Sequence, residues 1–380
     1  MRGDRNNFLS KTKRLVIKIG SSLLTDEKKK GINNFFLRHL AEQVKAFQSQ
    51  GIECLIVTSG AIAAGCFELG LKKRPLEISK LQALAAVGQS KLMHNYAVTF
   101  DRFGLKIAQV LLTRDDLSNR HRYSNAHNTL AELFQNEIVP IVNENDTVAV
   151  EEIKFGDNDT LAVLVTHLSE ADLLVLLTDT DGFFEEDPKL NPNTRLISDV
   201  FSLTNDLKNN AKKSKSLFGT GGMKTKILAA NNMMQSGLPM VIANGKTRNV
   251  LKRILDAEII GTFFYPANKK MNNRKRWLAW GVKPRGEIMV DEGAKKAILV
   301  NSKSLLPTGV KKISGHWNGG DVVKVIDLNR REIAKGIANY SSDDLDQIKG
   351  LNTSEMQSKL GYKLVDEVIH KDNLVRIEVL

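Results

Sequence analysis

Six short runs of apolar residues constrain the fold of this chain more than any other feature of its sequence. Several of them are apolar at every position instead of alternating with polar residues, which is typical of strands covered on both faces. Segments with helical spacing lie between them, for example 35–50, 130–134 and 161–167. Strands that alternate with helices predict an α/β fold, a parallel sheet in an αβα sandwich. The six runs are 15–19, 54–57, 107–112, 138–142, 173–177 and 240–243.

The pattern changes near residue 284, where short alternating strands replace the two-sided apolar runs. The segments 322–326 and 333–338 alternate, and turn residues separate them from their neighbours. This pattern predicts a small, mostly-β, barrel-like module. A chain of 380 residues also exceeds one ordinary domain. We expect an α/β domain over 12–268, a basic linker over 269–283, the β module over 284–362 and a C-terminal tail over 363–380.

The net charge of +12 raises nucleic acid as a partner, but its distribution argues against one. Residues 284–380 carry a net charge of only +1, so +11 lies in residues 1–283. We interpret the basic run within 269–276 as a solvated linker in preference to a nucleic-acid stripe. The remaining positive charge suits an anionic small substrate, and RNA is disfavoured.

The first fourteen residues are polar and basic, with no apolar run behind them. They therefore resemble neither a signal peptide nor a membrane span, and we expect a cytoplasmic protein. Two cysteines, Cys54 and Cys66, are too few for a disulfide framework or a four-cysteine zinc site. We expect both to be packing residues.

A glycine-rich turn at 219–222 precedes two lysines and an apolar, helix-like segment. Glycines let the backbone approach an anion closely, and unpaired N–H groups at a helix start point toward it. The stretch resembles a Walker A loop, but Met223 stands where that motif requires a glycine before Lys224. It therefore favours a nucleotide kinase outside the P-loop class. The structural alternative is a helix-capping turn with surface lysines.

Polar residues follow four of the predicted strands. They stand at 20–22, 58–60, 143–146 and 178–179. In open parallel sheets, ligands bind beyond the carboxyl ends of the strands. Each group alone is also an ordinary helix cap or turn. Their joint placement is what predicts a ligand site.

Lys18 lies inside an apolar strand, where a lysine is costly unless it faces an anion or lies at an edge. Lys226 adds a second cation beside the glycine turn. Two lysines around a phosphate suit phosphoryl transfer, which depends on charge neutralisation and in-line positioning. A carboxylate acceptor is ionised at neutral pH and needs no general base. This agrees with a sequence in which we recognise no nucleophile–base motif.

The segment 155–160 places Asn158 and Asp159 in a turn before an apolar helix. Asn158 suits a polar substrate, and Asp159 suits the orientation of the lysines by charge-assisted hydrogen bonds. A simple capping turn is the alternative. The acidic stretch 178–187 lacks the ligand pattern of an EF-hand. We expect no dedicated metal site, and a divalent cation that enters with the nucleotide phosphates.

Five ordered motifs resemble the glutamate 5-kinase family within the amino-acid kinases. They lie at 18–22, 57–62, 142–146, 156–159 and 219–226, and the region from Pro284 resembles a PUA domain. That appended domain separates this family from aspartate, acetylglutamate, carbamate and UMP kinases. The resemblance implies the amino-acid kinase fold and ATP-dependent phosphorylation of the γ-carboxylate of L-glutamate to L-glutamyl 5-phosphate, the first step of proline biosynthesis. It also implies ATP with Mg²⁺, feedback inhibition by proline and a homo-oligomer, either dimer or tetramer.

The matching motifs assign Ser59, Asp146 and Asn158 to glutamate. Lys18 and Lys226 would stabilise the transferring phosphoryl group, with Asp159 organising them. The segment 113–116 resembles the family's region near the substrate and inhibitor pocket. One departure is Lys224, where relatives are expected to have a small polar residue, and it leaves open which lysine reaches the phosphates. The contacts assigned to ATP are Lys18, Thr178, Asp179, Thr220, Gly221, Gly222, Met223, Lys224, Thr225 and Lys226.

Two other functions are alternatives to this interpretation of the sequence. PUA modules commonly bind RNA, so an RNA-binding protein is the alternative from another class. A sister kinase that acts on aspartate or UMP is the second alternative. Because acyl phosphates are labile, hand-off of the product to a glutamyl phosphate reductase is a further hypothesis.

Overall fold

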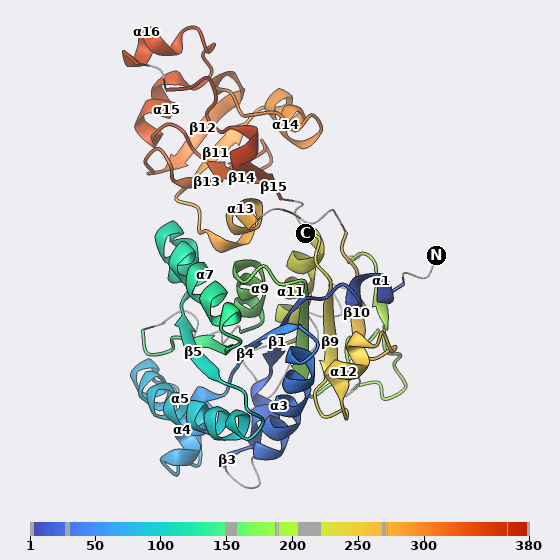
Figure 1. The fold of residues 1–380 in the computed structure, drawn as a ribbon. Coiled ribbons are helices and arrows are strands. Elements are labelled where there is room, and N and C mark those ends of the chain that lie inside the picture. The colour runs from blue at the N-terminus through green and yellow to red at the C-terminus, as the bar shows by residue number, and fades with distance from the viewer. Residues whose placement is uncertain are drawn as a thin grey trace. The chain divides into compact units, whose positions relative to one another are not determined.

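The computed structural model describes residues 4–26, 31–148, 158–186, 188, 190–203, 222–267, 271, 273–362 and 364–377. The chain divides into two compact units, Met1–Lys270 and Met271–Leu380 (Figure 1). Among the described residues, no helix is long and apolar enough to cross a membrane. The proposed domain limits at 268 and 284 stay predictions.

The first unit is built on an eight-stranded sheet with the order β5-β6-β4-β1-β7-β9-β10-β8. Neighbouring strands run parallel except for β9 and β10, which are antiparallel. A separate hairpin joins β2 and β3. The strands are β1 Arg14–Ile19, β2 Thr25–Asp26, β3 Gly31–Ile32, β4 Glu53–Val57, β5 Ile107–Leu112, β6 Val139–Glu144, β7 Leu173–Thr178, β8 Asp199–Val200, β9 Met240–Asn244 and β10 Thr262–Phe264.

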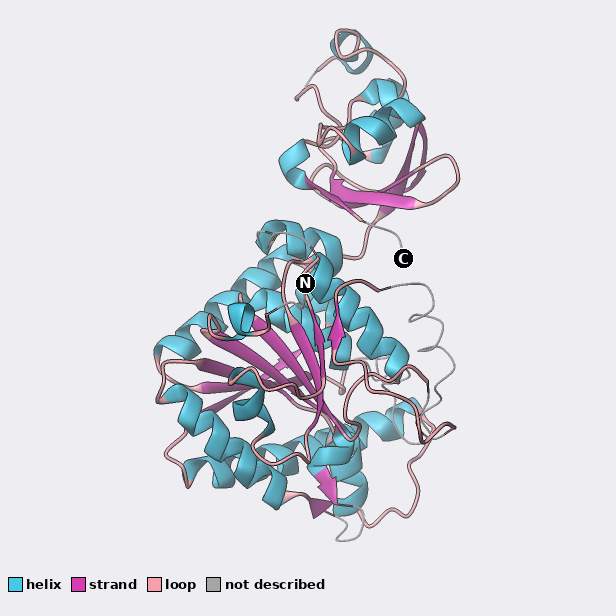
Figure 2. Ribbon diagram, turned by 90° about the vertical axis from the view of Figure 1, so that its right-hand side faces the viewer, coloured by secondary structure: helices cyan, strands magenta, loops and turns pink. Residues whose placement is uncertain are grey.

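Helices cover both faces of this sheet (Figure 2). One face packs against α3, α5 and α12, and the other against α7, α9 and α11. The predicted αβα sandwich is therefore confirmed. The helices described in this unit are α1 Asn6–Leu9, α2 Ser21–Leu24, α3 Asn34–Gln48, α4 Ala61–Glu68, α5 Ile78–Asp101, α6 Arg114–Ser118, α7 Arg120–Gln135, α9 Asn158–Leu168, α11 Met223–Gln235 and α12 Val250–Leu255.

The six apolar runs all form strands, with shifts of one or two residues at their ends. The clearest shift is in β6, because Asn143 and Glu144 belong to the strand and not to the turn after it. They pair with Leu111 and Leu112 of β5, which extends the ladder beyond the apolar run. Periodicity does not detect this extension, since it reads only the apolar positions.

Two glycines bring α4 and α5 into close contact. A Cβ on Gly88 would lie 1.8 Å from the Ala61 carbonyl oxygen, and a Cβ on Gly65 would lie 2.0 Å from the Leu84 carbonyl oxygen. Only glycine permits this approach of the two backbones. The contact positions the start of α4 and the middle of α5 beside the carboxyl end of the sheet.

The second unit contains a five-stranded sheet with the order β12-β11-β13-β14-β15, and all pairs except β11 with β13 are antiparallel. Part of the range predicted as a linker is helical here, and buried Leu278 and Ala279 pack against this unit. The elements are α13 Asn273–Arg276, the π-helical turn Trp277–Gly281, β11 Gly286–Val290, α14 Glu292–Leu299, the 3₁₀ turn Pro307–Gly309, β12 Val310–Gly315, β13 Val322–Ile326, β14 Glu332–Ile337, α15 Ser342–Ile348, α16 Met356–Leu360, the 3₁₀ turn Lys371–Asn373 and β15 Leu374–Arg376.

Candidate active site

Lys18 lies near the carboxyl end of β1, on the face of the sheet that α9 covers. Side chains alternate between the two faces of a strand. Leu15, Ile17 and Ile19 belong to the core against α3 and α5, so Lys18 points to the opposite face, where α9 packs on β1. Only 7% of Lys18 is exposed. A buried ammonium group requires a counter-charge.

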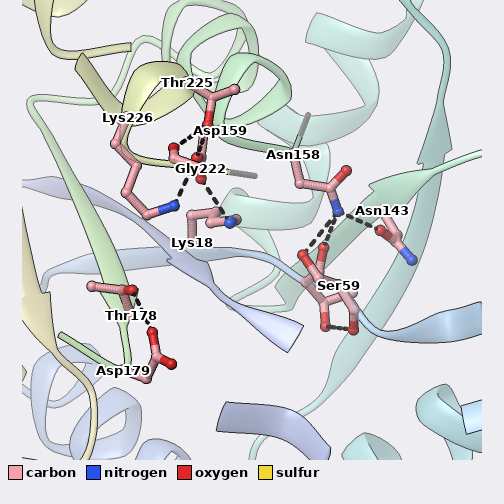
Figure 3. A network of polar contacts seen from close by, with 11 residues as sticks. Lys18, Ser59, Asn143, Asn158, Asp159, Thr178, Asp179, Gly222, Thr225 and Lys226 are labelled. Atoms are coloured by element: carbon pink, nitrogen blue, oxygen red, sulfur yellow. Dashed lines mark hydrogen bonds and ion pairs between the residues drawn. The ribbon is translucent and has the colours of Figure 1, made fainter. Parts of the chain in front are cut away.

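Asp159 of α9 supplies this counter-charge and is shared by two lysines (Figure 3). Its Oδ1 atom lies 2.7 Å from Lys18 Nζ, and its Oδ2 atom lies 3.1 Å from Lys226 Nζ. The exposed fractions of the three side chains are 1% for Asp159, 8% for Lys18 and 10% for Lys226. Two ammonium groups on one carboxylate leave a net charge of +1 in a largely dehydrated site. Such a site attracts an anion.

The same contacts set the protonation state of Asp159. Burial by itself raises the pKa of a carboxyl group, because it disfavours the charged form. The Lys18 ammonium and then the Lys226 ammonium outweigh burial, and a hydrogen bond from Thr225 adds to them, so that the pKa of Asp159 is held well below its usual range. Asp159 is therefore ionised at neutral pH and is a poor proton acceptor. Its contacts suit it to hold the two lysines in place.

The first turn of α11 is attached to this cluster. The Thr225 hydroxyl donates to Asp159 Oδ2 at 2.8 Å and lies 2.8 Å from the carbonyl oxygen of Gly222. Gly222 precedes α11 in an extended conformation, and the first turn of the helix carries no acidic residue. The positive end of the helix is thus compatible with a phosphate group.

The two lysines of the glycine-rich segment have different positions. Lys226 is buried against Asp159, whereas Lys224 is exposed on the first turn of α11. Met223 begins the helix. Thr220 and Gly221, which the sequence assigned to ATP, lie outside the described residues.

Asn158 is next to Asp159 on α9 but points to a second group of residues (Figure 3). Its Nδ2 atom lies 2.7 Å from the carbonyl oxygen of Thr58, 3.0 Å from Ser59 Oγ and 3.1 Å from Asn143 Oδ1. Ser59 and Asn158, which the sequence predicts to contact the substrate L-glutamate, are therefore in direct contact. The first turn of α9 connects this polar group with the lysine cluster.

The remaining predicted residues lie at the same edge of the sheet. Thr178 ends β7, the strand beside β1, and its hydroxyl donates to Asp179 Oδ1 at 3.2 Å. Asp179 itself is exposed. Asp146 follows β6 by two residues and is partly buried. These strand ends confirm the expected clustering of polar residues at one edge, while their contacts with a ligand stay predictions.

The structure reveals two partners that the sequence reasoning missed. Asn143 lies in the motif 142–146 but has no role assigned to it, and Gln89 of α5 lies in none of the motifs. Asn143 Nδ2 donates to Gln89 Oε1 at 2.8 Å. Gln89 follows Gly88 in an otherwise small and apolar stretch of the helix, and no periodic signal distinguishes it from a surface glutamine.

A cavity of about 460 Å³ lies on the α3 and α12 face, away from the lysine cluster. Its lining includes Phe36, Leu40 and Leu251. The lysine cluster lies on the opposite face of the sheet. The candidate site is therefore identified by its charge pairing and not by cavity size.

Two family models match the chain. The model described as "Amino acid kinase family" matches residues 13–244, and the model described as "PUA domain" matches residues 286–360. The first match contains the lysine cluster and the polar group around Asn158.

Curated proteins named glutamate 5-kinase are similar over nearly the whole length. The protein from Geobacter sp. (strain M21) is 46% identical over 371 residues, which cover 98% of this chain and 99% of that protein. The one from Geobacter sulfurreducens is 47% identical with the same coverage. The one from Caldanaerobacter subterraneus subsp. tengcongensis is 48% identical over 365 residues, which cover 96% of this chain and 98% of that protein. The similarity extends through both units.

Proposed function

The chain belongs to the amino acid kinase family and, within it, to the glutamate 5-kinases, and from this premise we propose that it transfers the γ-phosphoryl group of ATP to the γ-carboxylate of L-glutamate. The product is L-glutamyl 5-phosphate, the first intermediate of proline biosynthesis. The observation that carries the proposal is the pairing of Lys18 and Lys226 with the single carboxylate of Asp159.

The lysine pair matches the charge requirement of phosphoryl transfer. Negative charge spreads over the equatorial oxygens of the transferring group, and fixed cations stabilise it without covalent chemistry. Lys18 comes from β1 and Lys226 from α11, so one ammonium group approaches from each side of Asp159. In the proposed reaction, Asp159 is a positioning residue, because its low pKa keeps it ionised between the lysines.

The acceptor explains why the site needs no general base. The γ-carboxylate of glutamate has a pKa of about 4 and is already ionised at neutral pH. One of its oxygens attacks the γ-phosphorus of ATP. The bond between the γ-phosphorus and the oxygen that bridges it to the β-phosphorus breaks, ADP leaves, and no proton has to be removed. Ser59, Asn158 and Asp146 are the proposed glutamate contacts. The contact of Ser59 with Asn158 supports a common binding position for the substrate.

The nucleotide is proposed to bind between the end of β7 and the start of α11. Thr178 and Asp179 would contact one part of ATP, and residues 220–226 would contact its phosphates. Among the described residues, no group of three or more His, Cys, Asp or Glu side chains is arranged to hold a metal ion. Mg²⁺ usually binds through substrate phosphates with one or two carboxylates. We therefore propose that it enters with ATP, and Asp179 is an exposed carboxylate at this edge.

The proposal is tested by ADP release from purified protein with Mg-ATP and L-glutamate, L-aspartate or UMP as the acceptor. We expect release that depends on glutamate, trapping of the product as an acyl hydroxamate by hydroxylamine, and loss of both signals with EDTA. Release with aspartate or UMP and none with glutamate would assign the chain to a sister activity. No acceptor-dependent release, with folding verified by circular dichroism, would refute the kinase proposal.

Three further properties follow from the family and are proposals for this chain. Proline would inhibit the reaction, the protein would form a dimer or tetramer, and the labile product would pass to a glutamyl phosphate reductase. Proline titration in the same assay, light scattering and a coupled reductase assay test them separately.

A further inference from the structure

Three side-chain amides form a chain from the predicted glutamate site into α5. Asn158 Nδ2 of α9 donates to Asn143 Oδ1 of β6 at 3.1 Å, and Asn143 Nδ2 donates to Gln89 Oε1 of α5 at 2.8 Å. Asn143 is 2% exposed, so its amide has little access to water as an alternative partner. Figure 3 shows the first of these hydrogen bonds.

One backbone atom sets the orientation of all three side-chain amides. The carbonyl oxygen of Thr58 only accepts hydrogen bonds, and it lies 2.7 Å from the Asn158 amide group, so the nitrogen of that group must be the atom on this side. Asn143 must then present its oxygen to Asn158 and its nitrogen to Gln89. Gln89 in turn must present its oxygen. A single carbonyl group therefore orients three amides, and Gln89 Oε1 is the last acceptor.

This orientation has a consequence for the substrate. The two N–H donors of Asn158 are shared among the oxygens of Thr58, Ser59 and Asn143, which leaves its Oδ1 atom as the atom available to a ligand. An amide oxygen accepts hydrogen bonds, and the α-ammonium group of an amino acid is a strong donor. The chain of amides thus favours a ligand that carries an ammonium group.

Gln89 also retains an unpaired donor. Its Nε2 atom is buried and has no hydrogen-bond partner among the described residues. A buried amide nitrogen without an acceptor is costly to the fold and calls for an explanation. Methionine at this position would remove the unpaired nitrogen of Gln89 but leave Asn143 Nδ2 without its acceptor. One unpaired group would replace another, so we expect little net change in stability.

We propose that Gln89 is a positioning residue for glutamate: its Oε1 atom fixes the amide of Asn143, and through it the amide of Asn158, so that Asn158 Oδ1 receives the α-ammonium group. This inference rests on the proposed function. It concerns the recognition of the amino acid and not the transfer of the phosphoryl group.

The test compares the full-length wild type with Gln89→Met and Gln89→Glu in the ADP-release assay. We expect Gln89→Met to raise KM for glutamate about tenfold, the effect of losing one positioned hydrogen bond. KM for ATP should stay within about twofold, and Tm within a few degrees. Gln89→Glu keeps an acceptor for Asn143 and should restore KM for glutamate to within about threefold. Asn95→Leu, a half-buried position on the same helix whose amide donates to the Lys91 carbonyl, is the matched control.

A second readout uses glutarate, which has both carboxylates of glutamate but no ammonium group. We expect Gln89→Met to reduce the preference for glutamate over glutarate about tenfold, because the contact with the ammonium group is weakened. An unchanged KM and preference in Gln89→Met, with an active wild type, would overturn this inference and leave the proposed function intact. Equal losses in Gln89→Met and Gln89→Glu would overturn it as well. A wild type without glutamate-dependent ADP release would overturn both.

Discussion

Replacing Asp159 with asparagine removes the charge that holds two buried lysines. The substitution preserves the shape of the side chain, so packing changes little and the loss of charge dominates. Lys18 and Lys226 would then be ammonium groups with about 10% exposure or less and no carboxylate beside them. Removing one partner of a buried ion pair costs about 3–5 kcal/mol. A domain of this size loses about 2–4 °C per kcal/mol, so we expect Tm to fall by about 6–20 °C at pH 7.

The loss of stability caused by this substitution should depend on pH. The pKa of Asp159 is lowered on folding. Its ionised form therefore contributes stability that is complete above the unfolded pKa of about 3.9 and is lost as the pH falls through the depressed folded value. The difference in stability between the wild type and Asp159→Asn should be constant from pH 7 to pH 5. It should shrink below about pH 4.

Thermal unfolding followed by circular dichroism measures both effects. Asp256→Asn is the matched control, because Asp256 pairs with Lys252 on the exposed side of α12, and such a surface pair contributes about 0–1 kcal/mol. A Tm for Asp159→Asn within about 2 °C of that control at pH 7 would refute the assignment of a buried, charge-compensating role. A difference that grows below pH 4 would contradict the direction of the pKa shift.

Three other predictions concern the lysines, the helix contact and the thiols. Lys226→Met should lower kcat in the ADP-release assay by about 10²–10³-fold, since it removes a fixed cation from beside the transferring charge. Replacement of the exposed lysine, Lys224→Met, should lower kcat less than tenfold. The reverse order would exchange the roles of the two lysines. Gly88→Ala should destabilise the protein by at least about 1–3 kcal/mol, because the new Cβ would lie 1.8 Å from the Ala61 carbonyl oxygen, and an unchanged urea midpoint would contradict this close contact. Burial raises the pKa of the Cys54 thiol to about 12, so its thiolate fraction at pH 8 should be about a thousandfold below that of an ordinary thiol. Rapid thiol labelling of Cys54 in the folded enzyme, read by mass spectrometry, would disprove this low thiolate fraction.

The sequence predicted the layers of the fold because they depend on local patterns. The apolar runs and helical spacings report burial on one or two faces, and each became a strand or helix at the expected place. Parallel strands also bring their carboxyl ends to one edge, so the polar residues after β1, β4 and β7 were expected near one another. The end of β6 was misjudged, because pairing with β5 extends the strand through polar Asn143 and Glu144.

The sequence by itself determined which residue types are available at the site: two lysines, one carboxylate and an amide on neighbouring elements of a parallel α/β domain. The resemblance assigned Lys226 to the transferring phosphoryl group, but Lys224 follows the same glycine turn and left open which lysine reaches the phosphates. The tertiary structure separates the two lysines through helix geometry, because residues two positions apart on α11 point in different directions: Lys226 reaches Asp159, whereas Lys224 is exposed. It also joined Gln89 to Asn143 across 54 residues of sequence, a pairing that lies beside the close contact of Gly88 with Ala61 and that no local pattern encodes.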